Sequence, residues 1–426
     1  MNNGGREMIN NLQEYMNTIG KNAKDASRLL NKLDTVSKNN ALLLMADKLV
    51  ENTEKIVSAN ALDVSAAELK GTPEPMIDRL MLNEKRIQAM AKSIREIASL
   101  NDPINDVIEM KHMPNNLQIG KTRVPLGVIG IIYESRPNVT SDAATLCLKA
   151  GNAVILRGGS DAVNSNMEIA KTLSAALQES GLPKTAIQYV EVTDRAAVDI
   201  MMKLNKYIDV LIPRGGASLI NNVVNNSSVP VIETGIGNCH VFVDETADLA
   251  MAEAIVINAK TQRPGVCNAM ETLLVHKAVA ECFLPKLSES LKALGVEIRG
   301  CTETQKLVSF AKAATEEDYA TEFLDLILAV KVVDSLDEAL DHIYKYSSGH
   351  SEAIITNSYK NSQRFLREVD SAAVYVNAST RFTDGGEFGF GGEIGISTQK
   401  LHARGPMGVN ELTTTKYIIY GEGQIR

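Results

Sequence analysis

The chain has 426 residues, of which 44% are hydrophobic and 23% are charged, so disorder, collagen and coiled coil are poor descriptions of it as a whole. Its formal net charge of −8 provides no general attraction for nucleic acid or for anionic lipid. Aromatic residues make up only 4% and tryptophan is absent, which disfavours proteins that stack bases or sugars on aromatic side chains. We therefore expect a globular protein of about two to four domains.

The five cysteines are an odd and sparse set for a chain of this length, which argues against a disulfide framework. The first ten residues are polar, and no apolar run approaches the roughly 18 residues that a membrane span needs. The longest runs, such as residues 128–132, have the length of a strand. These features predict a cytoplasmic protein with reduced thiols and no membrane association.

The first hundred residues show the spacing of amphipathic helices. Apolar residues recur at helical intervals in residues 41–50 and again in residues 87–97. A stretch with glycine and proline at 71–75 marks a turn between these segments, and Pro103 ends the helical region. The N-terminal quarter is therefore expected to be helical.

From about residue 124 the pattern changes to short β-branched runs with helical segments between them. Strands are predicted at 124–133, 153–156, 187–190, 208–212 and 229–232, with helices at 162–177 and 195–204. Alternation of strands and helices at this spacing is typical of βαβ units, in which the sheet is mostly parallel.

A second alternating block follows in the C-terminal half of the chain. Strands are predicted at 271–275, 327–333, 353–355 and 373–376, with helices at 249–259, 278–294 and 336–346. A glycine-dense stretch at 385–395 and a strand at 413–420 close the sequence. We interpret the whole as two α/β lobes joined near residue 234, with the chain returning toward the first lobe after about residue 375.

Several familiar motifs are absent from the sequence. There is no G-x-G-x-x-G that opens a strand–helix unit, no G-x-x-x-x-G-K-[ST] and no H-E-x-x-H. The six histidines lack the spacing of metal ligands, and there is no C-x-x-C. We therefore expect no metal centre.

The sharpest local feature is the segment 258–269, in which a helix ends in a loop that carries Arg263, Pro264 and then Cys267. A thiolate is a nucleophile, and a neighbouring cation lowers the pKa of a thiol. The alternative is that Cys267 is a small buried apolar residue, as most free cysteines are. Cys147 lies in an apolar helical stretch and is expected to belong to the core.

A second feature is Glu233, which ends an apolar strand and precedes the glycine-rich turn of Gly235 and Gly237. Side chains at the carboxyl ends of parallel strands face the usual ligand crevice of an α/β sheet. The alternative is a structural carboxylate that caps the turn.

A third feature follows the strand near residue 133, where Glu134, Arg136 and Asn138 come in succession. The Asn138 amide could stabilise an oxyanion, and the Arg136 guanidinium suits a phosphate or a carboxylate. The alternative is a solvated turn in which Asn138 caps a helix. In the same way, a strand ends at Arg157 and enters a glycine turn before Ser160, which suits a phosphate-bearing ligand.

Taken together, these motifs resemble the aldehyde dehydrogenase superfamily, and more specifically its gamma-glutamyl phosphate reductase family. The resemblance covers essentially the whole chain and several long motifs in the right order. The matching segments are Pro125-Leu-Gly-Val-Ile-Gly-Ile-Ile-Tyr-Glu-Ser-Arg-Pro-Asn-Val-Thr140, 258–269, 333–339, 350–354, 377–386 and 395–408.

The resemblance implies a fold of two doubly wound parallel-sheet lobes with a small β arm for oligomerisation. A cofactor-binding domain would comprise residues 1–103 and 125–234 with a return segment 377–395, a catalytic domain residues 235–376, and the arm residues 104–124 and 396–426.

The resemblance also implies roles for the candidate catalytic residues. Cys267 would be the nucleophile, with Asn138 and the Cys267 backbone N–H as the oxyanion hole. Glu233 matches the superfamily's general base, although its deacylating role has no obvious place in a reductive reaction.

For the cofactor, Arg157 stands where the family has a basic residue on the adenosine ribose, and Glu322 where it holds the nicotinamide ribose. Ser160 stands where members that prefer NAD often carry an acid, so the resemblance favours NADPH. Gly158, Gly215 and Gly216 complete the predicted cofactor site. The family does not use the glycine fingerprint, so its absence is no objection.

The implied reaction is the NADPH-dependent reduction of L-glutamyl 5-phosphate to L-glutamate 5-semialdehyde and phosphate through a Cys267 thioacyl intermediate. The substrate's two anionic groups require cations, and its ammonium requires a carboxylate or carbonyl. Arg136 and Arg381 are the anion candidates, with His350 and Ser351 in support. Glu134 or Glu352 could meet the ammonium; each of these residues could instead be part of a surface ion pair or a turn.

Two alternatives remain open: another, non-phosphorylating dehydrogenase that oxidises a small aldehyde, and a catalytically inactive binding module on the same fold. No kinase domain precedes residue 124, so a separate glutamate 5-kinase would supply the acyl phosphate. The strand at 413–420 and the segment 117–124 resemble the family's projecting arm, and an exposed two-stranded edge invites pairing with a partner. We therefore expect a homodimer or a homotetramer.

Overall fold

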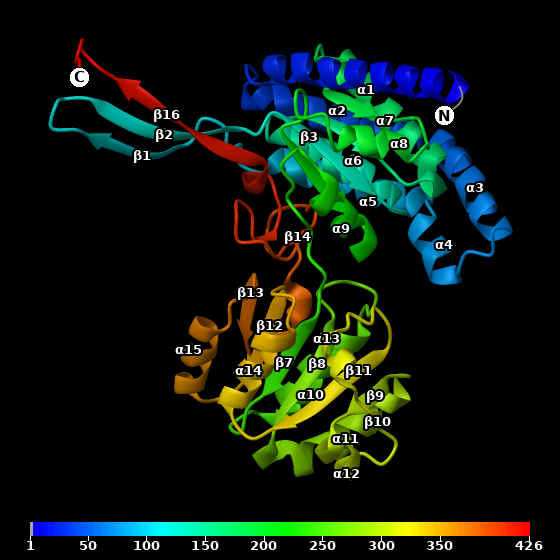
Figure 1. The fold of residues 1–426 in the computed structure, drawn as a ribbon, viewed down its shortest axis with the longest axis vertical. Coiled ribbons are helices and arrows are strands. Elements are labelled where there is room, and N and C mark those ends of the chain that lie inside the picture. Colours follow the sequence, from blue (N-terminus) through cyan, green and yellow to red (C-terminus); the bar gives the residue numbers. More distant parts are fainter. Residues whose placement is uncertain (1–2) are drawn as a thin grey trace. The chain divides into compact units, whose positions relative to one another are not determined.

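The structure, a computed structural model, describes the backbone of residues 3–426 and the side chains from residue 11 onward, except that of Pro75. The chain forms two compact units (Figure 1). Unit 1 comprises the chain up to Thr234 with residues 389–395 and 407–426, and unit 2 comprises residues 235–388 and 396–406. The chain therefore leaves unit 1 after residue 234, and it is residue 389, rather than 377, that first returns to it.

Unit 1 is built on a four-stranded sheet in which all neighbouring strands are parallel, as the alternating pattern predicted. Its order is β5-β4-β3-β6, with β3 Val128–Tyr133, β4 Ala153–Arg157, β5 Ile187–Tyr189 and β6 Val210–Arg214. Every residue of β3 and β4 is buried, because helices cover both faces of the sheet.

Two of the predicted strands of unit 1 are wrong in detail. The apolar run 124–133 belongs to two different strands, because Gly127 has a φ of +123° and breaks the run between β2 and β3. The run 229–232 is not a strand: only Val231 forms a bridge, to Leu211. Pro230 offers no backbone N–H, which limits pairing at this edge.

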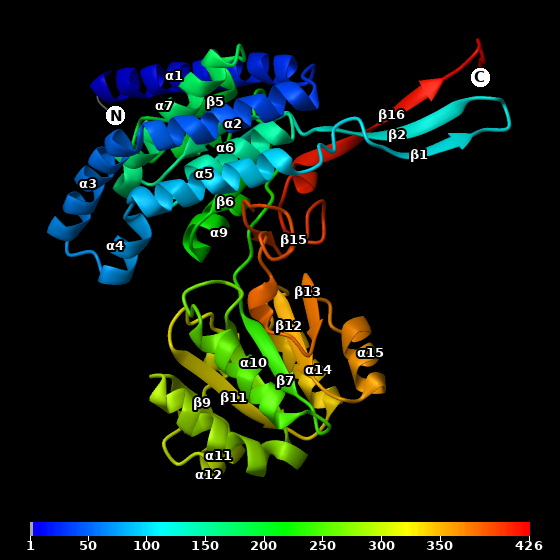
Figure 2. The ribbon, with the colours of Figure 1, turned by 180° about the vertical axis from the view of Figure 1, so that it is seen from behind.

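The helices of unit 1 confirm the helical reading of the first hundred residues. They are α1 Asn3–Leu30, α2 Thr35–Glu51, α3 Thr53–Leu69, α4 Glu74–Leu80, α5 Glu84–Ser99, α6 Pro137–Lys149, α7 Val163–Glu179, α8 Ala196–Met201 and α9 Ala217–Asn226, with short 3₁₀ turns η1 Ser160–Ala162, η2 Lys184–Ala186 and η4 Asn410–Leu412. Asp34 and Asn83 cap α2 and α5 by accepting hydrogen bonds from backbone amides of the first turn. Figure 2 shows α2, α5 and α6 lying side by side.

A three-stranded antiparallel sheet forms an arm on unit 1, and both views show it extending away from the helices (Figures 1 and 2). Its order is β1-β2-β16, with β1 Val107–His112, β2 Gln118–Pro125 and β16 Thr413–Tyr420. The strand predicted at 413–420 has these bounds, whereas β1 was not predicted. Side chains along β1 and β16 are largely exposed, so the arm has little core of its own.

Unit 2 contains a seven-stranded sheet that is parallel throughout. Its order is β10-β9-β11-β8-β7-β12-β13, with β7 Cys239–Val243, β8 Met270–His276, β9 Glu297–Gly300, β10 Lys312–Ala313, β11 Ile327–Val333, β12 Ser351–Ile355 and β13 Ala373–Val376. A short pair, β14 Ile396–Ser397 and β15 Gly405–Pro406, lies outside it. Strands β7, β9 and β10 were not predicted.

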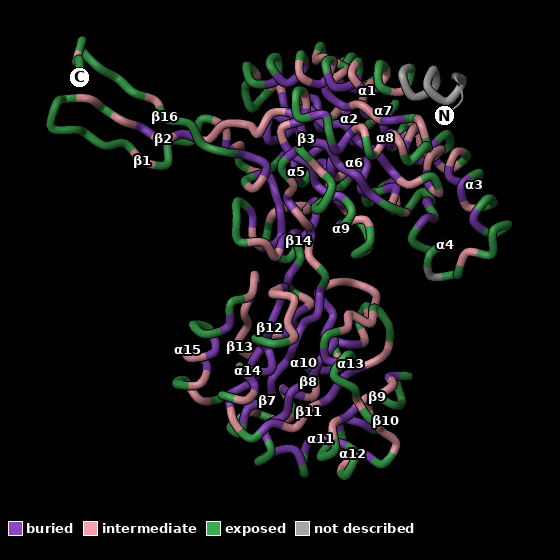
Figure 3. Tube along the Cα trace, viewed as in Figure 1, coloured by how far each residue is buried: buried purple, intermediate pink, exposed green. Residues whose placement is uncertain are grey.

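Alternate side chains of the central strands enter two separate cores, one on each face of the sheet. Val241 and Val243 of β7 pack in one core, whereas Phe242 between them packs in the other. Figure 3 shows these central strands as buried. The helices are α10 Leu249–Thr261, α11 Lys277–Ala293, α12 Thr302–Leu307, α13 Glu316–Ala320, α14 Leu336–Tyr346 and α15 Tyr359–Glu368, with the 3₁₀ turn η3 Thr380–Phe382. The helices predicted at 249–259, 278–294 and 336–346 are confirmed as α10, α11 and α14.

Candidate active site

Cys267 lies in the loop that joins the end of α10 to the start of β8 in unit 2, and its side chain is half-buried. The backbone of this loop is held by neighbouring residues. The carbonyl of Cys267 accepts a hydrogen bond from the thiol of Cys239, at the start of β7, with Sγ 3.1 Å from the oxygen. The position of the proposed nucleophile is therefore fixed from the adjoining strand.

The backbone of Gly237 packs directly against the carbonyl group of Cys267. A Cβ added at Gly237 would lie 1.6 Å from the carbonyl oxygen of Cys267 and 2.5 Å from its Cα, so only glycine fits there. The Gly237 amide donates a hydrogen bond of 2.8 Å to Oε1 of Glu322. Glu322 is half-buried, and burial raises the pKa of its carboxyl against the effect of that amide. Gly237 thus connects Glu322 with Cys267.

The segment 380–383 lies on another side of the Cys267 loop, where Asn268 fastens it. The side-chain amide of Asn268 donates to the carbonyls of Thr383, at 2.8 Å, and Arg381, at 3.3 Å. Thr380 Oγ1 in turn donates to the carbonyl of Asn268, at 2.7 Å. Because Asn268 follows Cys267 directly, these hydrogen bonds place the segment of Arg381 beside Cys267.

The guanidinium of Arg381 is the cation that this segment brings to the site. Its Nε donates to Oε1 of Gln262 at 3.0 Å. Burial lowers the pKa of Arg381, and the positive charge of Arg263 adds to this effect, although the group remains cationic at any physiological pH. Two arginines of unit 2 therefore face the same region, which suits an anionic ligand.

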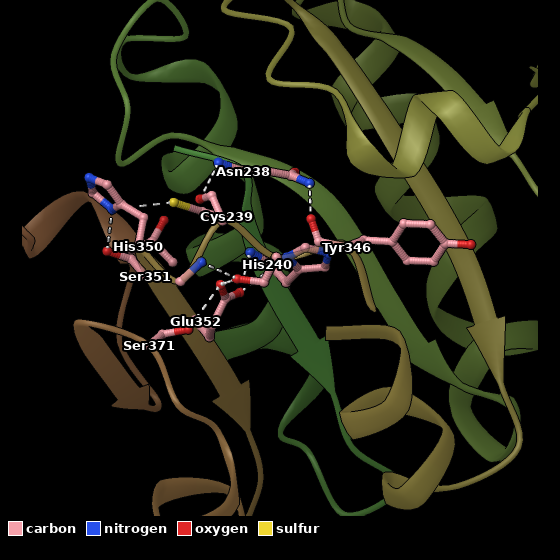
Figure 4. A network of polar contacts seen from close by, with 12 residues as sticks. Asn238, Cys239, His240, Tyr346, His350, Ser351, Glu352 and Ser371 are labelled. Carbon is pink, nitrogen blue, oxygen red and sulfur yellow. Dashed lines mark hydrogen bonds and ion pairs between the residues drawn. The ribbon is translucent and has the colours of Figure 1, made fainter. Parts of the chain in front are cut away.

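His350 and Ser351 form a buried polar chain behind this region (Figure 4). Nδ1 of His350 lies 2.8 Å from Oγ of Ser351 and 3.7 Å from Sγ of Cys239. Ser351 Oγ continues to the hydroxyl of Thr383, at 2.6 Å. Both side chains are fully buried, so they support the loop segments around Cys267 from within the protein.

The suggestion that Glu352 binds a substrate ammonium is wrong. Its side chain is fully buried in β12, where Oε2 accepts from the backbone amide of His240 at 2.7 Å and Oε1 accepts from the hydroxyl of Ser347 at 2.5 Å (Figure 4). The sequence could not reveal this, because the position follows a glycine turn like the other candidates but points into the core.

Cys239 was not singled out from the sequence, yet this fully buried residue supports the carbonyl of Cys267. Burial raises the pKa of its thiol well above the usual range, which keeps it protonated and able to donate. Cys147, by contrast, is a core residue of α6, as predicted.

In unit 1, the candidate residues follow the carboxyl ends of the strands, as expected. Glu134 follows β3, and its Oε2 accepts from the amide of Gly216, the N-cap of α9, at 2.9 Å. A Cβ at Gly215 would come within 2.5 Å of the same oxygen. A predicted substrate residue and two predicted cofactor residues therefore form one cluster, with the carboxylate at the positive end of a helix.

Asn138 is exposed in the first turn of α6, and its Nδ2 donates to Oδ2 of Asp142 at 3.0 Å. This bond fixes which end of the amide carries the hydrogens, and a primary amide still has a second hydrogen to donate. Burial raises the pKa of Asp142 to about 6, against the effects of the Asn138 amide and the charge of Arg214. The sequence singled out Asn138 but gave no signal for Asp142.

Arg157 ends β4, and its buried guanidinium binds backbone carbonyls rather than projecting outward. Nη2 donates to the carbonyl of Thr193 at 2.9 Å, and Nη1 donates to that of Gly158. Its Nε is buried without a hydrogen-bond partner among the described residues. Burial lowers the pKa of Arg157, and the positive charge of Arg195 adds to this.

Ser160 and Arg195 are exposed polar residues of this region. From the sequence, Arg195 was predicted only as the first residue of a helix. A hydroxyl, a second arginine and the glycine turn at Gly158 fit an anionic dinucleotide, because they offer donors and positive charge without a competing acid at position 160.

The structure thus gathers the candidates into two groups. Unit 2 brings together Cys267, Glu322, His350, Ser351 and Arg381. Unit 1 carries Asn138, Glu134, Arg136, Arg157, Gly158, Ser160, Gly215, Gly216 and Glu233, with Arg136 and Glu233 half-buried and each in contact with neighbours. Among the side chains that the structure describes, no three His, Cys, Asp or Glu residues are grouped to hold a metal, and none of the described helices has the length and apolar character of a membrane span.

The chain is similar to known proteins over nearly its whole length. The model of the aldehyde dehydrogenase family matches residues 11–318 and 319–418. A gamma-glutamyl phosphate reductase from Clostridium novyi is 66% identical over 416 residues, 98% of this chain and 100% of that protein. One from Caldanaerobacter subterraneus subsp. tengcongensis is 65% identical over 406 residues, 95% of this chain and 98% of that protein.

A solved structure is similar over the same length. The crystal structure of gamma-glutamyl phosphate reductase from Thermotoga maritima superimposes with a TM-score of 0.94 at 51% identity, covering 96% of this chain and 99% of that one. An acetylating aldehyde dehydrogenase from Geobacillus thermoglucosidasius has a TM-score of 0.72 at 18% identity, which shows a shared fold.

Proposed function

The chain belongs to the aldehyde dehydrogenase family, among the gamma-glutamyl phosphate reductases, and we propose that it reduces L-glutamyl 5-phosphate to L-glutamate 5-semialdehyde and phosphate, the second step of proline biosynthesis from glutamate. The observation that carries this proposal is the 66% identity over the full length of a protein of that name. The enzyme is an oxidoreductase that acts on a small molecule, with NAD or NADP as the redox partner that this family uses.

We assign the nucleophilic step to Cys267. Its thiolate attacks the acyl carbon, the C–S bond forms, and the C–O bond to phosphate breaks to release inorganic phosphate. The Asn138 amide and the Cys267 backbone N–H are the proposed donors to the oxyanion. Support for this assignment comes from the fixed backbone of Cys267 and from the Asp142 bond that orients the Asn138 nitrogen.

When bound, the dinucleotide supplies the hydride that reduces the thioester. We assign the nicotinamide ribose to Glu322, whose carboxylate is fixed by Gly237 next to the nucleophile. The adenosine end is assigned to Ser160, Gly158 and the arginines of unit 1, with Arg157 ordering the turn and Arg195 supplying exposed charge. Because position 160 carries no acid, NADPH is the preferred form in this proposal.

After hydride transfer, the Cys267 sulfur leaves as the thiolate and the aldehyde is released. No water attacks the thioester in the reductive direction, so Glu233 has no deacylating task there. We therefore propose that Glu233 has a supporting role, either in positioning the reacting groups or in exchanging a proton with the Cys267 thiol.

We propose that Arg136 and Arg381 bind the anionic groups of the substrate, because each is a half-buried guanidinium beside a proposed catalytic residue. His350 and Ser351 act through the loops that they support. Glu134 caps α9 by accepting a hydrogen bond from the Gly216 amide. To bind the substrate ammonium, it would have to give up this hydrogen bond.

The partner enzyme, the cellular location and the oligomeric state are also part of the proposal. An acyl phosphate is reactive, so we propose a functional link to a separate glutamate 5-kinase that forms it. The five cysteines, none of which forms a disulfide within the chain, suit the cytoplasm. The arm with β2 and β16 supports the proposal of a homodimer or homotetramer.

The reaction run in reverse tests this function against its rival, a dehydrogenase that uses water. Wild-type enzyme is mixed with glutamate semialdehyde and NADP⁺, with and without phosphate or arsenate, and NADPH formation is followed. The proposal predicts turnover only when one of these anions is present. Sustained turnover in the absence of both would favour the rival and contradict the proposal.

A further inference from the structure

A buried ion pair outside the proposed catalytic residues lies at the base of the Cys267 loop. Lys260 Nζ and Glu271 Oε2 are 2.5 Å apart, and both side chains are fully buried. Burying two charges costs free energy that a single contact often does not offset, so such a pair calls for a reason beyond stability.

The two residues stand at the two ends of the loop that carries the nucleophile. Lys260 is in the last turn of α10, which ends at Thr261, and Glu271 is the second residue of β8. Their contact therefore closes residues 262–269 at the base, with Cys267 between them. A loop with its ends joined in this way has fewer conformations to sample.

Glu271 also holds a second loop. Its Oε1 accepts a hydrogen bond of 3.1 Å from the backbone amide of Leu324, whose φ of +55° lies in the left-handed region. A left-handed leucine is strained, so the anchor keeps the backbone in a conformation that it would otherwise leave. Glu322, two residues earlier, is thereby placed where its carboxylate meets the Gly237 amide.

One carboxylate thus connects three segments: the end of α10 through Lys260, the start of β8, and the loop of Glu322. From Glu322 the contacts continue through Gly237 to the backbone of Cys267. We propose that Lys260 and Glu271 are positioning residues that set the place of Glu322, and with it the nicotinamide ribose, relative to Cys267. This inference rests on the proposed function for the role of Glu322, but the anchor itself is a property of the fold.

The pKa shifts of Lys260 and Glu271 show that burial of this pair is electrostatically unfavourable, as expected for a pair that is not there for stability alone. Burial raises the pKa of Glu271 to about 7, despite the opposing effect of Lys260, and the negative charge of Glu322 adds to the rise. Burial likewise lowers the pKa of Lys260. Both groups are held in an environment that disfavours their charged forms.

Three variants separate positioning from stability. E271Q keeps an oxygen that can accept from Leu324, whereas E271L removes it. The double variant K260M/E271L replaces the pair by apolar side chains of similar size, a change that often leaves stability intact. The matched control is K38M/D102L in unit 1, where a buried pair of the same kind, also 2.5 Å apart, has a carboxylate that accepts from the amide of Ile104.

The readouts are hydrogen exchange of the Gly237 and Leu324 amides, KM for NADPH, kcat, and urea unfolding. For E271L and K260M/E271L we expect exchange of these two amides to speed up, and KM for NADPH to rise, by about tenfold, the factor that loss of one buried hydrogen bond implies. The double variant should unfold at a urea concentration near that of wild type. E271Q should retain most of the protection.

Wild-type exchange and wild-type KM in K260M/E271L would overturn the proposal, and so would an equal loss in K38M/D102L. If wild-type enzyme fails to turn over the proposed substrate, the function is wrong, and exchange at Gly237 and Leu324 still decides whether the anchor exists. If the anchor is present by exchange but KM for NADPH is unchanged, the positioning role is wrong and the function stands.

Discussion

At the scale of single residues, the site depends on how tightly the backbone of Cys267 is enclosed. The thiol of Cys239 holds its carbonyl and Gly237 approaches the same atom, while Asn268 fastens the next peptide to the segment of Arg381. The sequence identified Cys267 because an arginine and a proline precede it within a loop. It could not identify Cys239 or Glu271, because their roles depend on strands that are adjacent only in space.

Gly237→Ala should be severely damaging. The added Cβ would overlap the Cys267 carbonyl, so the proposed nucleophile must shift, and a displacement of about 1 Å can reduce kcat about 100-fold. Steady-state assays on the folded variant check this. Gly392→Ala is the control, since its Cβ would meet nothing closer than 3.4 Å. Near-normal kcat in G237A would show that this close approach does not position the nucleophile.

Cofactor choice should respond to the charge at Ser160. Ser160→Asp places a carboxylate where the proposal puts the 2′-phosphate, and repulsion of about 1 kcal/mol between solvent-exposed charges a few ångströms apart corresponds to roughly a five- to tenfold rise in KM for NADPH. KM for NADH should change little, and the neutral Ser160→Asn should leave the ratio of the two near that of wild type. An equal rise for both cofactors in the aspartate variant would place the adenosine ribose elsewhere.

Asp142 should make stability depend on pH. Its pKa rises from 3.8 to about 6 on folding, so the folded state binds this proton more tightly than the unfolded state does. Its contribution is therefore complete below pH 3.8 and is lost as the pH rises through 6. Asp142→Asn removes this loss, so its unfolding free energy relative to wild type should increase from about pH 4 to just above pH 6, by up to about 3 kcal/mol in total, and then level off.

Urea unfolding at several pH values measures this difference. The same difference between variant and wild type at pH 3.5 and at pH 8 would mean that Asp142 is not buried enough to titrate as expected. In that case its carboxylate would be ionised throughout and its bond to the Asn138 amide would be independent of pH.

At the scale of elements, the spacing of apolar residues predicted strands and helices best where the apolar pattern runs through the whole element without interruption. Strand β16 was predicted with its true bounds, and α10, α11 and α14 were located within a few residues. Strand β7 was missed because His240 interrupts its apolar run and only the fold shows that the imidazole is buried. The run at 229–232 was misjudged because Pro230 leaves it a single bridge to the sheet.

The arm provides a test at this scale. Tyr417 and Ile419 of β16 are 63% and 61% exposed and lie on the same face of the strand, an apolar surface that the proposed oligomer would cover. Replacing both by lysine should lower the mass measured by light scattering to that of a smaller assembly. Thr414→Lys, on the opposite face, is the control. An unchanged mass in the double variant would show that this face is not an interface.

At the scale of the whole molecule, the change from helices to alternating strands and helices was sufficient to predict two parallel-sheet lobes divided near residue 234. The point of return at residue 389 was not predictable, because the glycine-dense stretch has no periodicity that assigns it to either unit. The net charge of −8 disfavours large polyanions, but it is compatible with local sites for small anions. The cations that we propose for binding small anions, Arg136, Arg195 and Arg381, are local features of an acidic chain.

The intact mass of the protein shows whether a thioacyl group forms on Cys267, the step on which the proposed reaction depends. The enzyme is incubated with glutamate semialdehyde and NADP⁺ without phosphate, the reaction is quenched in acid, and the mass of the intact protein is measured by mass spectrometry. Wild type should gain one γ-glutamyl group, which added phosphate should remove, and Cys147→Ala should behave in the same way. Cys267→Ala should gain nothing; an adduct of unchanged yield in that variant, or none in wild type while turnover proceeds, would contradict the account.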